Sequence, residues 1–193
     1  MPLATAFAGG ISTSKFERFF NPKKIKDGGS VRLTFLGDDS VAGWEVWIDG
    51  PDGKGKCIVF ASEPDTTDLS TRADEEGGKV RPDSLDKAKK MFYFWIWNYE
   101  TERVELLQFN QKQIAEKLDL YFQDEEVQAE PHLFDFVIHK TSTGPAARDV
   151  KYDVTSLAGR RNKGNYNAQI EEAWKAHTGN LRAIFTGGDP FKG

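Results

Sequence analysis

Positions 89–99 read Lys-Lys-Met-Phe-Tyr-Phe-Trp-Ile-Trp-Asn-Tyr, a run of large rings that is apolar at odd and even positions alike. Successive side chains of a β-strand point to opposite faces, so this run predicts a strand that buries or binds something on each side. The core face would hold Phe92, Phe94 and Ile96. The opposite face would hold Lys89, Tyr93, Trp95 and Trp97. Three exposed rings in a row are unusual on a soluble protein and favour a binding surface.

Shorter segments on both sides of this strand alternate in the same way. Strands are expected at 31–36, 44–49, 56–60, 103–109, 133–140 and 150–154. A helix is expected at 110–122, where Asn110 and Gln113 have the spacing of a capping box, and a second at 167–177. The pattern predicts a mainly β fold: a five-stranded, OB-fold-like antiparallel barrel with one inserted helix and a short C-terminal helix. A β-sandwich is the alternative.

Composition divides the chain into three parts. We expect an N-terminal arm at 1–22, an OB-fold-like domain at 23–157, and a C-terminal helix and tail at 158–193. Inside the domain, residues 61–86 are rich in Asp, Glu, Ser, Thr and Gly, and predict a flexible acidic loop. Its carboxylates would mimic DNA and compete with phosphates. In the alternative interpretation the loop is a lid whose basic residues, Arg72, Lys79 and Arg81, contact phosphates.

Several classes of protein do not fit the composition. Cys57 is the single cysteine, so the chain has no internal disulfide, and His132, His139 and His177 are too scattered to complete a zinc site. We therefore expect no metal and no other cofactor. No apolar stretch is long enough to span a membrane, and the first ten residues lack the basic region of a signal peptide, which predicts an intracellular protein.

Charge is unevenly distributed, although the net charge is only -4. Basic residues outnumber acidic ones in 15–32 and again in 140–163, whereas acids dominate the expected loop. Rings interleaved with Lys and Arg supply base stacking and phosphate neutralisation, the two interactions that single-stranded nucleic acid requires. The competing interpretation is that the tail helix, through Trp174, or a second subunit covers Tyr93, Trp95 and Trp97.

A family resemblance supports the nucleic-acid interpretation. Gly-Gly-Ser-Val-Arg-Leu-Thr-Phe-Leu, then Trp-Glu-Val-Trp, then the aromatic strand with the following Asn-Tyr-Glu-Thr-Glu-Arg-Val-Glu-Leu-Leu-Gln-Phe, and finally Phe-Asp-Phe-Val-Ile-His-Lys resemble the single-stranded-DNA-binding proteins of tailed phages. The likeness covers about residues 23–154. It implies an OB-fold whose aromatic and basic residues hold the DNA strand. The chain differs from members with a structural zinc, and it ends in Gly-Gly-Asp-Pro-Phe-Lys-Gly instead of a strongly acidic tail.

We therefore expect a protein that performs no catalysis and binds single-stranded DNA with little sequence preference, in replication, recombination or repair. Replication or recombination proteins are the further candidate partners. The expected binding residues are Arg32, Trp47, Lys54, Lys56, Lys89, Tyr93, Trp95, Trp97, Lys140, Arg148 and Lys151.

Two other functions stay open at this point. The first is a metal-dependent nuclease, for which the carboxylates of Asp38, Asp39, Asp52 and Asp149 are the candidates. The second is an adaptor that grips a protein with the aromatic face.

Overall fold

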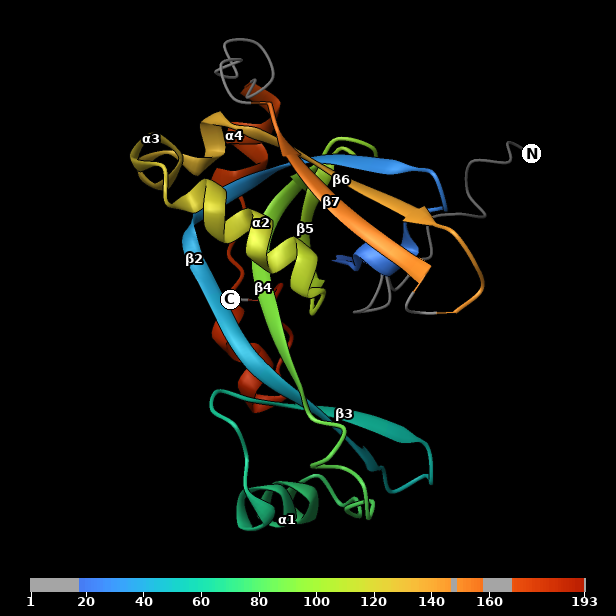
Figure 1. Cartoon of the computed structure of the whole chain (residues 1–193). Helices are drawn as coiled ribbons and strands as arrows, with labels where there is room; N and C mark the ends of the chain where they lie inside the picture. Colours follow the sequence, from blue (N-terminus) through green and yellow to red (C-terminus); the bar gives the residue numbers. More distant parts are fainter. Residues whose placement is uncertain (1–17, 147–148, 158–167, 193) are drawn as a thin grey trace, which may run out of the picture.

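A computed structural model describes residues 18–146, 149–157 and 168–192 and shows a mainly β fold with several helices (Figure 1). The strands are β1 (Phe19–Phe20), β2 (Ser30–Asp49), β3 (Gly55–Phe60), β4 (Lys89–Asn98), β5 (Arg103–Phe109), β6 (Asp135–Ser142) and β7 (Val150–Ser156). The helices are α1 (Thr66–Glu75), α2 (Lys112–Phe122), α3 (Glu125–Ala129) and α4 (Ala168–Lys175). Short 3₁₀ helices are η3 (Pro22–Lys24), η4 (Pro131–Leu133) and η6 (Leu181–Thr186).

All seven strands belong to one open sheet. The order is β1-β5-β4-β2-β6-β7, with β3 paired to β2 beside this path. Every pairing is antiparallel except that of β1 with β5. The mainly β prediction is confirmed, but the expected count of five strands is wrong and the sheet does not close into a barrel. The two short strands expected at 31–36 and 44–49 form one continuous strand, β2, and β1 is a strand that the sequence analysis did not expect.

A bulge bends β2, and the two halves of this strand belong to different parts of the molecule. Phe35 pairs with Ile96, but the next pair along the two strands is Ser40 with Phe94, so β2 has extra residues here. Gly37 has a φ of 67°, a left-handed conformation that glycine adopts without a steric cost. Beyond the bulge, β2 and β4 run on together to the part of the molecule that carries β3 and α1 (Figure 1).

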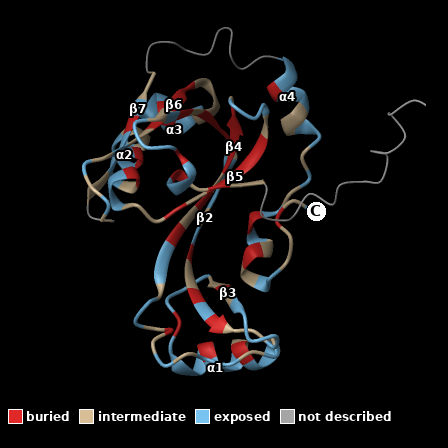
Figure 2. Cartoon of the chain, turned by 90° about the vertical axis from the view of Figure 1, so that its right-hand side faces the viewer, coloured by how far each residue is buried: buried red, intermediate tan, exposed pale blue. Residues whose placement is uncertain are grey.

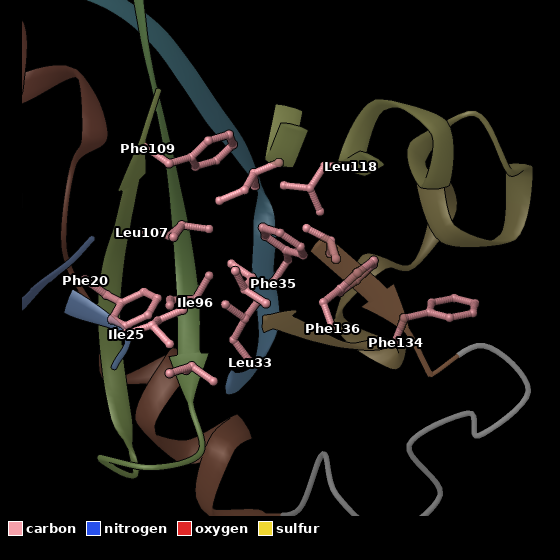
Figure 3. Close-up of a cluster of buried hydrophobic side chains, with 14 of the residues drawn as sticks. Phe20, Ile25, Leu33, Phe35, Ile96, Leu107, Phe109, Leu118, Phe134 and Phe136 are labelled. Carbon is pink, nitrogen blue, oxygen red and sulfur yellow. The ribbon is translucent and has the colours of Figure 1, made fainter. Parts of the chain in front are cut away.

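The main hydrophobic core lies between the sheet and α2. Figure 3 shows Leu33 and Phe35 of β2 among side chains from β4, β5, β6 and α2. Phe35 makes edge-to-face contacts with Phe94 and Phe136, whose ring centroids lie 5.3 and 5.0 Å away. Phe92 and Phe94 pack against this core and Ile96 is buried in it, so the sequence identified the core face of β4 correctly.

A second core covers the other face of β4. Tyr93, Trp95 and Trp97 lie here and are 1%, 2% and 3% exposed. The C-terminal segment covers them: Ile170, Leu181 and Ile184 are buried in the same cluster, which Trp174 and Phe191 flank. Figure 2 shows buried residues along β4 and β5, with η6 beside the lower part of the sheet. The competing interpretation, cover by the tail, is therefore the one that the structure confirms.

The acidic segment has more structure than the sequence indicated. Helix α1 occupies its middle, and Asp65 and Asp68 form a reciprocal capping box at the helix start. Leu69 and Ala73 are 0% and 1% exposed and pack against β2 and β3. The expectation of an irregular loop over 61–86 is wrong, because two small apolar contacts and a cap are enough to anchor one short helix.

The start of α2 also differs from expectation. Gln111 is the N-cap and makes no side-chain capping bond, whereas Gln113 accepts a hydrogen bond from the backbone N–H of Tyr152 at 2.7 Å. Gln113 therefore ties α2 to the edge strand β7 instead of capping its own helix. Within the described ranges, no helix is both long enough and apolar enough to cross a membrane.

Candidate nucleic-acid interface

Trp47 is the tryptophan that faces solvent. It is 49% exposed, although the side chains next to it in β2, Val46 and Ile48, are fully buried. Two contacts fix its position: Ser84 donates its hydroxyl to the Trp47 carbonyl at 2.7 Å, and the ring lies against Gly55. A Cβ atom at position 55 would be 3.2 Å from Trp47 Cε3, so a side chain there would crowd the ring.

Surface cavities lie on both sides of Trp47, and Glu45 lines both of them. The first, of about 510 Å³, lies between β3 and the C-terminal segment and is lined by residues that include Phe19, Lys56, Tyr93, Gln108 and Ile184. The second, of about 480 Å³, is lined by Arg81, Asp83, Ser84, Lys87 and Lys89 together with Glu45 and Trp47. We call these the β3-side cavity and the Lys89-side cavity. The half-exposed Trp47 ring thus lies between the β3-side cavity and the Lys89-side cavity.

Cationic side chains surround this ring. Lys56 pairs with Glu76, Arg81 with Asp49 at 2.7 Å, and Lys87 with Asp83. Lys89 is exposed and has no ion pair within the described part of the chain, and the same holds for Lys23 of η3. Lys89 lines the Lys89-side cavity, and the charges of both lysines act on Glu45. Unpaired lysines are the cations that most readily accept a phosphate as a new partner.

Glu45 lies at the boundary between the two cavities. Its Oε1 accepts a hydrogen bond from the Tyr93 hydroxyl at 2.8 Å and another from Gln108 Nε2. Burial raises the pKa of the Glu45 carboxyl, and those two hydrogen bonds and the charges of Lys23 and Lys89 act in the opposite direction. The same burial raises the pKa of the Tyr93 phenol. The site therefore contains a partly desolvated carboxyl held by two neutral donors.

The structure corrects the aromatic half of the predicted site. Tyr93, Trp95 and Trp97 are covered, so the expectation that their rings face solvent is wrong; the Tyr93 side chain still lines the β3-side cavity. Trp95 contacts His177 and Phe191, with ring centroids 4.2 and 5.1 Å away. Burial and the nearby Arg18 lower the pKa of His177 to about 4, so His177 is neutral beside Trp95 at neutral pH.

The predicted basic residues divide into two groups. Lys56 and Lys89 line the cavities beside Trp47, and Lys54 lies in the turn between β2 and β3, where it pairs with Asp52. Arg32 instead binds Asp135 and lies over the Tyr99 ring, while Lys140 donates to the carbonyls of Lys23 and Ile25. Lys151 is exposed on β7, far along the sheet from Trp47, and Arg148 lies outside the described residues. The structure thus brings Trp47, Lys56 and Lys89 together, and Tyr93 lines the same cavity as Lys56.

The sequence analysis missed Glu45, Gln108 and Lys23. Glu45 could have been predicted from the sequence, because it is two positions from Trp47 and so shares its strand face. Gln108 could have been predicted too, because a hairpin that turns between residues 98 and 103 pairs Tyr93 with Gln108. No local pattern placed Lys23 there, because its position depends on the backbone of η3, which Lys140 holds.

The carboxylates considered for a nuclease lie in three different parts of the fold. Asp52 caps the backbone N–H of Lys54, Asp149 accepts from Ala146 N, and Asp38 and Asp39 lie at the bulge of β2. No group of three His, Cys, Asp or Glu side chains that could hold a metal ion occurs among the described residues. Burial, with a smaller effect of Glu45, raises the pKa of the Cys57 thiol to about 12, so the thiol stays protonated.

Comparison of the chain with protein-family models, with curated proteins and with solved structures gave no match.

Proposed function

We propose that this protein binds and protects single-stranded DNA at the surface around Trp47, and that it does not cleave or modify the strand. The observation that carries this proposal is the half-exposed Trp47 ring, set between two cavities and surrounded by lysines. Bases stack on such a ring at about 1 to 3 kcal/mol each. A duplex keeps its bases stacked on one another, so the ring selects single strands.

The lysines supply the second interaction. Lys89 and Lys23 have no carboxylate partner within the described residues, and Lys54 pairs only with the exposed Asp52 at 3.5 Å. Exposed ion pairs of this kind contribute little, so a phosphate can replace Asp52 at small cost. The resemblance to phage single-stranded-DNA-binding proteins supports the same role in replication, recombination or repair, and with it an OB-fold ancestry for the sheet. Proteins of those processes are the proposed further partners.

The test is a titration with a mixed-sequence single strand, followed by tryptophan fluorescence at two salt concentrations. Among five tryptophans, Trp47 is the exposed one, so bases that stack on it should quench the signal. We expect tight binding at low salt, weaker binding at high salt, much weaker binding of the matching duplex, and an intact strand after incubation with Mg²⁺. Absence of binding at low salt, or equal binding of the duplex, would refute the proposal.

A further inference from the structure

We propose that the β3-side cavity receives one base of the bound strand and selects bases that carry an exocyclic amino group, namely cytosine, adenine and guanine, over thymine. This inference rests on the proposed function, since it concerns the surface around Trp47. It adds a partial base preference to a site whose stacking ring alone has none.

The walls of the cavity suit a flat, mostly apolar ring with a polar edge. Phe19, Ile58, Val59 and Ile184 supply apolar surface, and the Trp47 ring lies at its boundary. Small-molecule sites in proteins have this character: apolar walls and a few polar groups that fix orientation. At about 510 Å³ the cavity has room for one base together with part of its sugar.

The polar groups at the inner end present acceptors. Glu45 uses Oε1 for both Tyr93 and Gln108, and its Oε2 makes no hydrogen bond within the described part of the chain. Gln108 donates one hydrogen of its NH₂ group to Glu45, which leaves its amide oxygen as an acceptor and its second N–H as a donor. The Tyr93 hydroxyl donates to Glu45 and is therefore not offered to a ligand as a donor. A ligand edge that reaches Glu45 Oε2 meets an oxygen atom that accepts.

An exocyclic amino group is the matching donor. Carboxylates accept from the N4 amino group of cytosine, and N6 of adenine or N2 of guanine offers the same two N–H groups. Thymine has one ring N–H, and a carbonyl oxygen flanks it on each side. Both carbonyls would face the Glu45 carboxylate, which repels them.

Glu45 and Trp47 are correctly spaced for one base to touch both. They occupy one face of β2 two positions apart, which corresponds to about 6.5 Å along a strand. A base lying against the ring can therefore extend its edge toward Glu45. Lys56 and Arg72 line the same cavity, and each pairs with Glu76. The phosphate backbone of the bound DNA therefore has cations near this opening.

The experiment compares short oligomers of deoxycytidine and deoxyuridine, which share charge, sugar and ring size. Their bases differ along one edge: cytosine has an amino group at position 4 beside an unprotonated N3, and uracil has a carbonyl group beside an N3–H. We expect the deoxycytidine oligomer to bind the intact protein about tenfold more tightly, in line with a single good base contact. An oligomer of N4,N4-dimethyl-deoxycytidine, which has no amino N–H, should lose that advantage. This comparison needs no variant and so does not depend on folding.

The variant Glu45→Gln sharpens the test. The amide oxygen should keep the bonds from Tyr93 and Gln108, so the amide NH₂ would replace Oε2 and offer a donor in place of an acceptor. The preference should then shift toward deoxyuridine, whereas Trp47→Ala should weaken both oligomers alike. Equal binding of the two oligomers by the intact protein, with mixed-sequence binding retained, overturns this inference alone. Retention of the cytosine preference in Glu45→Gln also overturns it. Loss of binding to every strand overturns the proposed function instead.

Discussion

Gly37 and Trp174 lie so close that a Cβ atom at position 37 would be 2.6 Å from Trp174 Cζ2. Helix α4 therefore packs on the bulge of β2 through Trp174. Because glycine has no side chain, the Trp174 indole can approach the backbone at position 37. This contact joins the middle of the sheet to the C-terminal segment that covers Tyr93, Trp95 and Trp97.

Replacing Gly37 with Ala should lower the free energy of unfolding by about 3 kcal/mol, because the positive φ costs roughly 1 to 2 kcal/mol and crowding of the indole adds to it. Gly28→Ala is the matched control: Gly28 has a φ of 71°, yet a Cβ there would meet nothing within 4 Å. Urea denaturation of both variants measures the difference. Equal losses in the two variants would mean that the contact with Trp174 does not stabilise the fold.

Trp95 and Trp47 should respond in opposite ways to replacement by Ala. Trp95 is 2% exposed beneath Phe191 and His177, so Trp95→Ala should lower the free energy of unfolding by about 3 to 5 kcal/mol. Trp47→Ala should leave stability nearly unchanged and weaken DNA binding roughly 5- to 100-fold. Thermal unfolding and fluorescence anisotropy with a labelled oligomer separate the two effects. A stable Trp95→Ala variant with impaired binding would restore Trp95 to the interface.

Phe94 and Trp95 show how much of the fold could be predicted from the sequence. Strict alternation in β4 placed Phe94 and Trp95 on opposite faces, and both assignments to a face are correct. Alternation does not say what covers a face, however. The cover over Trp95 comes from residues 168–192, whose contact with β4 is set by tertiary packing, so the sequence indicated Trp174 only as one of two possible covers.

The sequence analysis did not predict helix α1, for a different reason. Its buried side is Leu69 and Ala73, too little apolar surface to stand out from a segment dominated by charge. The Asp65 and Asp68 cap was a usable start signal that the composition of the segment obscured. At the site, Lys56 and Lys89 lie near Trp47 because β3 and β4 both pair with β2. Lys140 lies elsewhere, because its ammonium group is used to hold η3.

Lys89 should contribute to the salt dependence of binding. It is exposed at the start of β4, lines the Lys89-side cavity and has no ion pair within the described ranges, so a phosphate is its natural partner. Lys89→Ala should lower the magnitude of the slope of log K against log salt by about 0.7, the value for one contact with a single strand. Lys151→Ala removes an equal charge from distant β7 and should leave the slope unchanged. Equal changes in the two variants would point to a diffuse charge effect.

Glu76 should act as an internal competitor of phosphate. It pairs with Lys56 and with Arg72, and both cations line the β3-side cavity. Glu76→Gln should therefore tighten DNA binding, most clearly at low salt, where electrostatic interactions are least screened. Asp74→Asn is the control, since it removes the same charge from an exposed side chain of α1 with no ion pair in the described part of the chain. Weaker binding of Glu76→Gln would contradict this role and favour the lid interpretation, in which Arg72, Lys79 and Arg81 contact phosphates.

Glu45 should make stability depend on pH in a defined direction. Burial raises the pKa of its carboxyl in the folded protein above the unfolded value, despite the hydrogen bonds from Tyr93 and Gln108 and the charges of Lys23 and Lys89. Folding therefore favours the protonated form. This contribution to stability is fully present below the unfolded pKa, near 4.3, and is lost as pH rises through the folded pKa. Glu45→Gln, which cannot ionise, should be more stable than the parent protein at neutral pH, and the difference should shrink as the pH falls toward 4. Urea denaturation of both proteins across this range measures it, with Glu116→Gln on the exposed side of α2 as the control. A stability difference that grows at low pH would show that the Tyr93 and Gln108 hydrogen bonds outweigh the burial of the carboxylate.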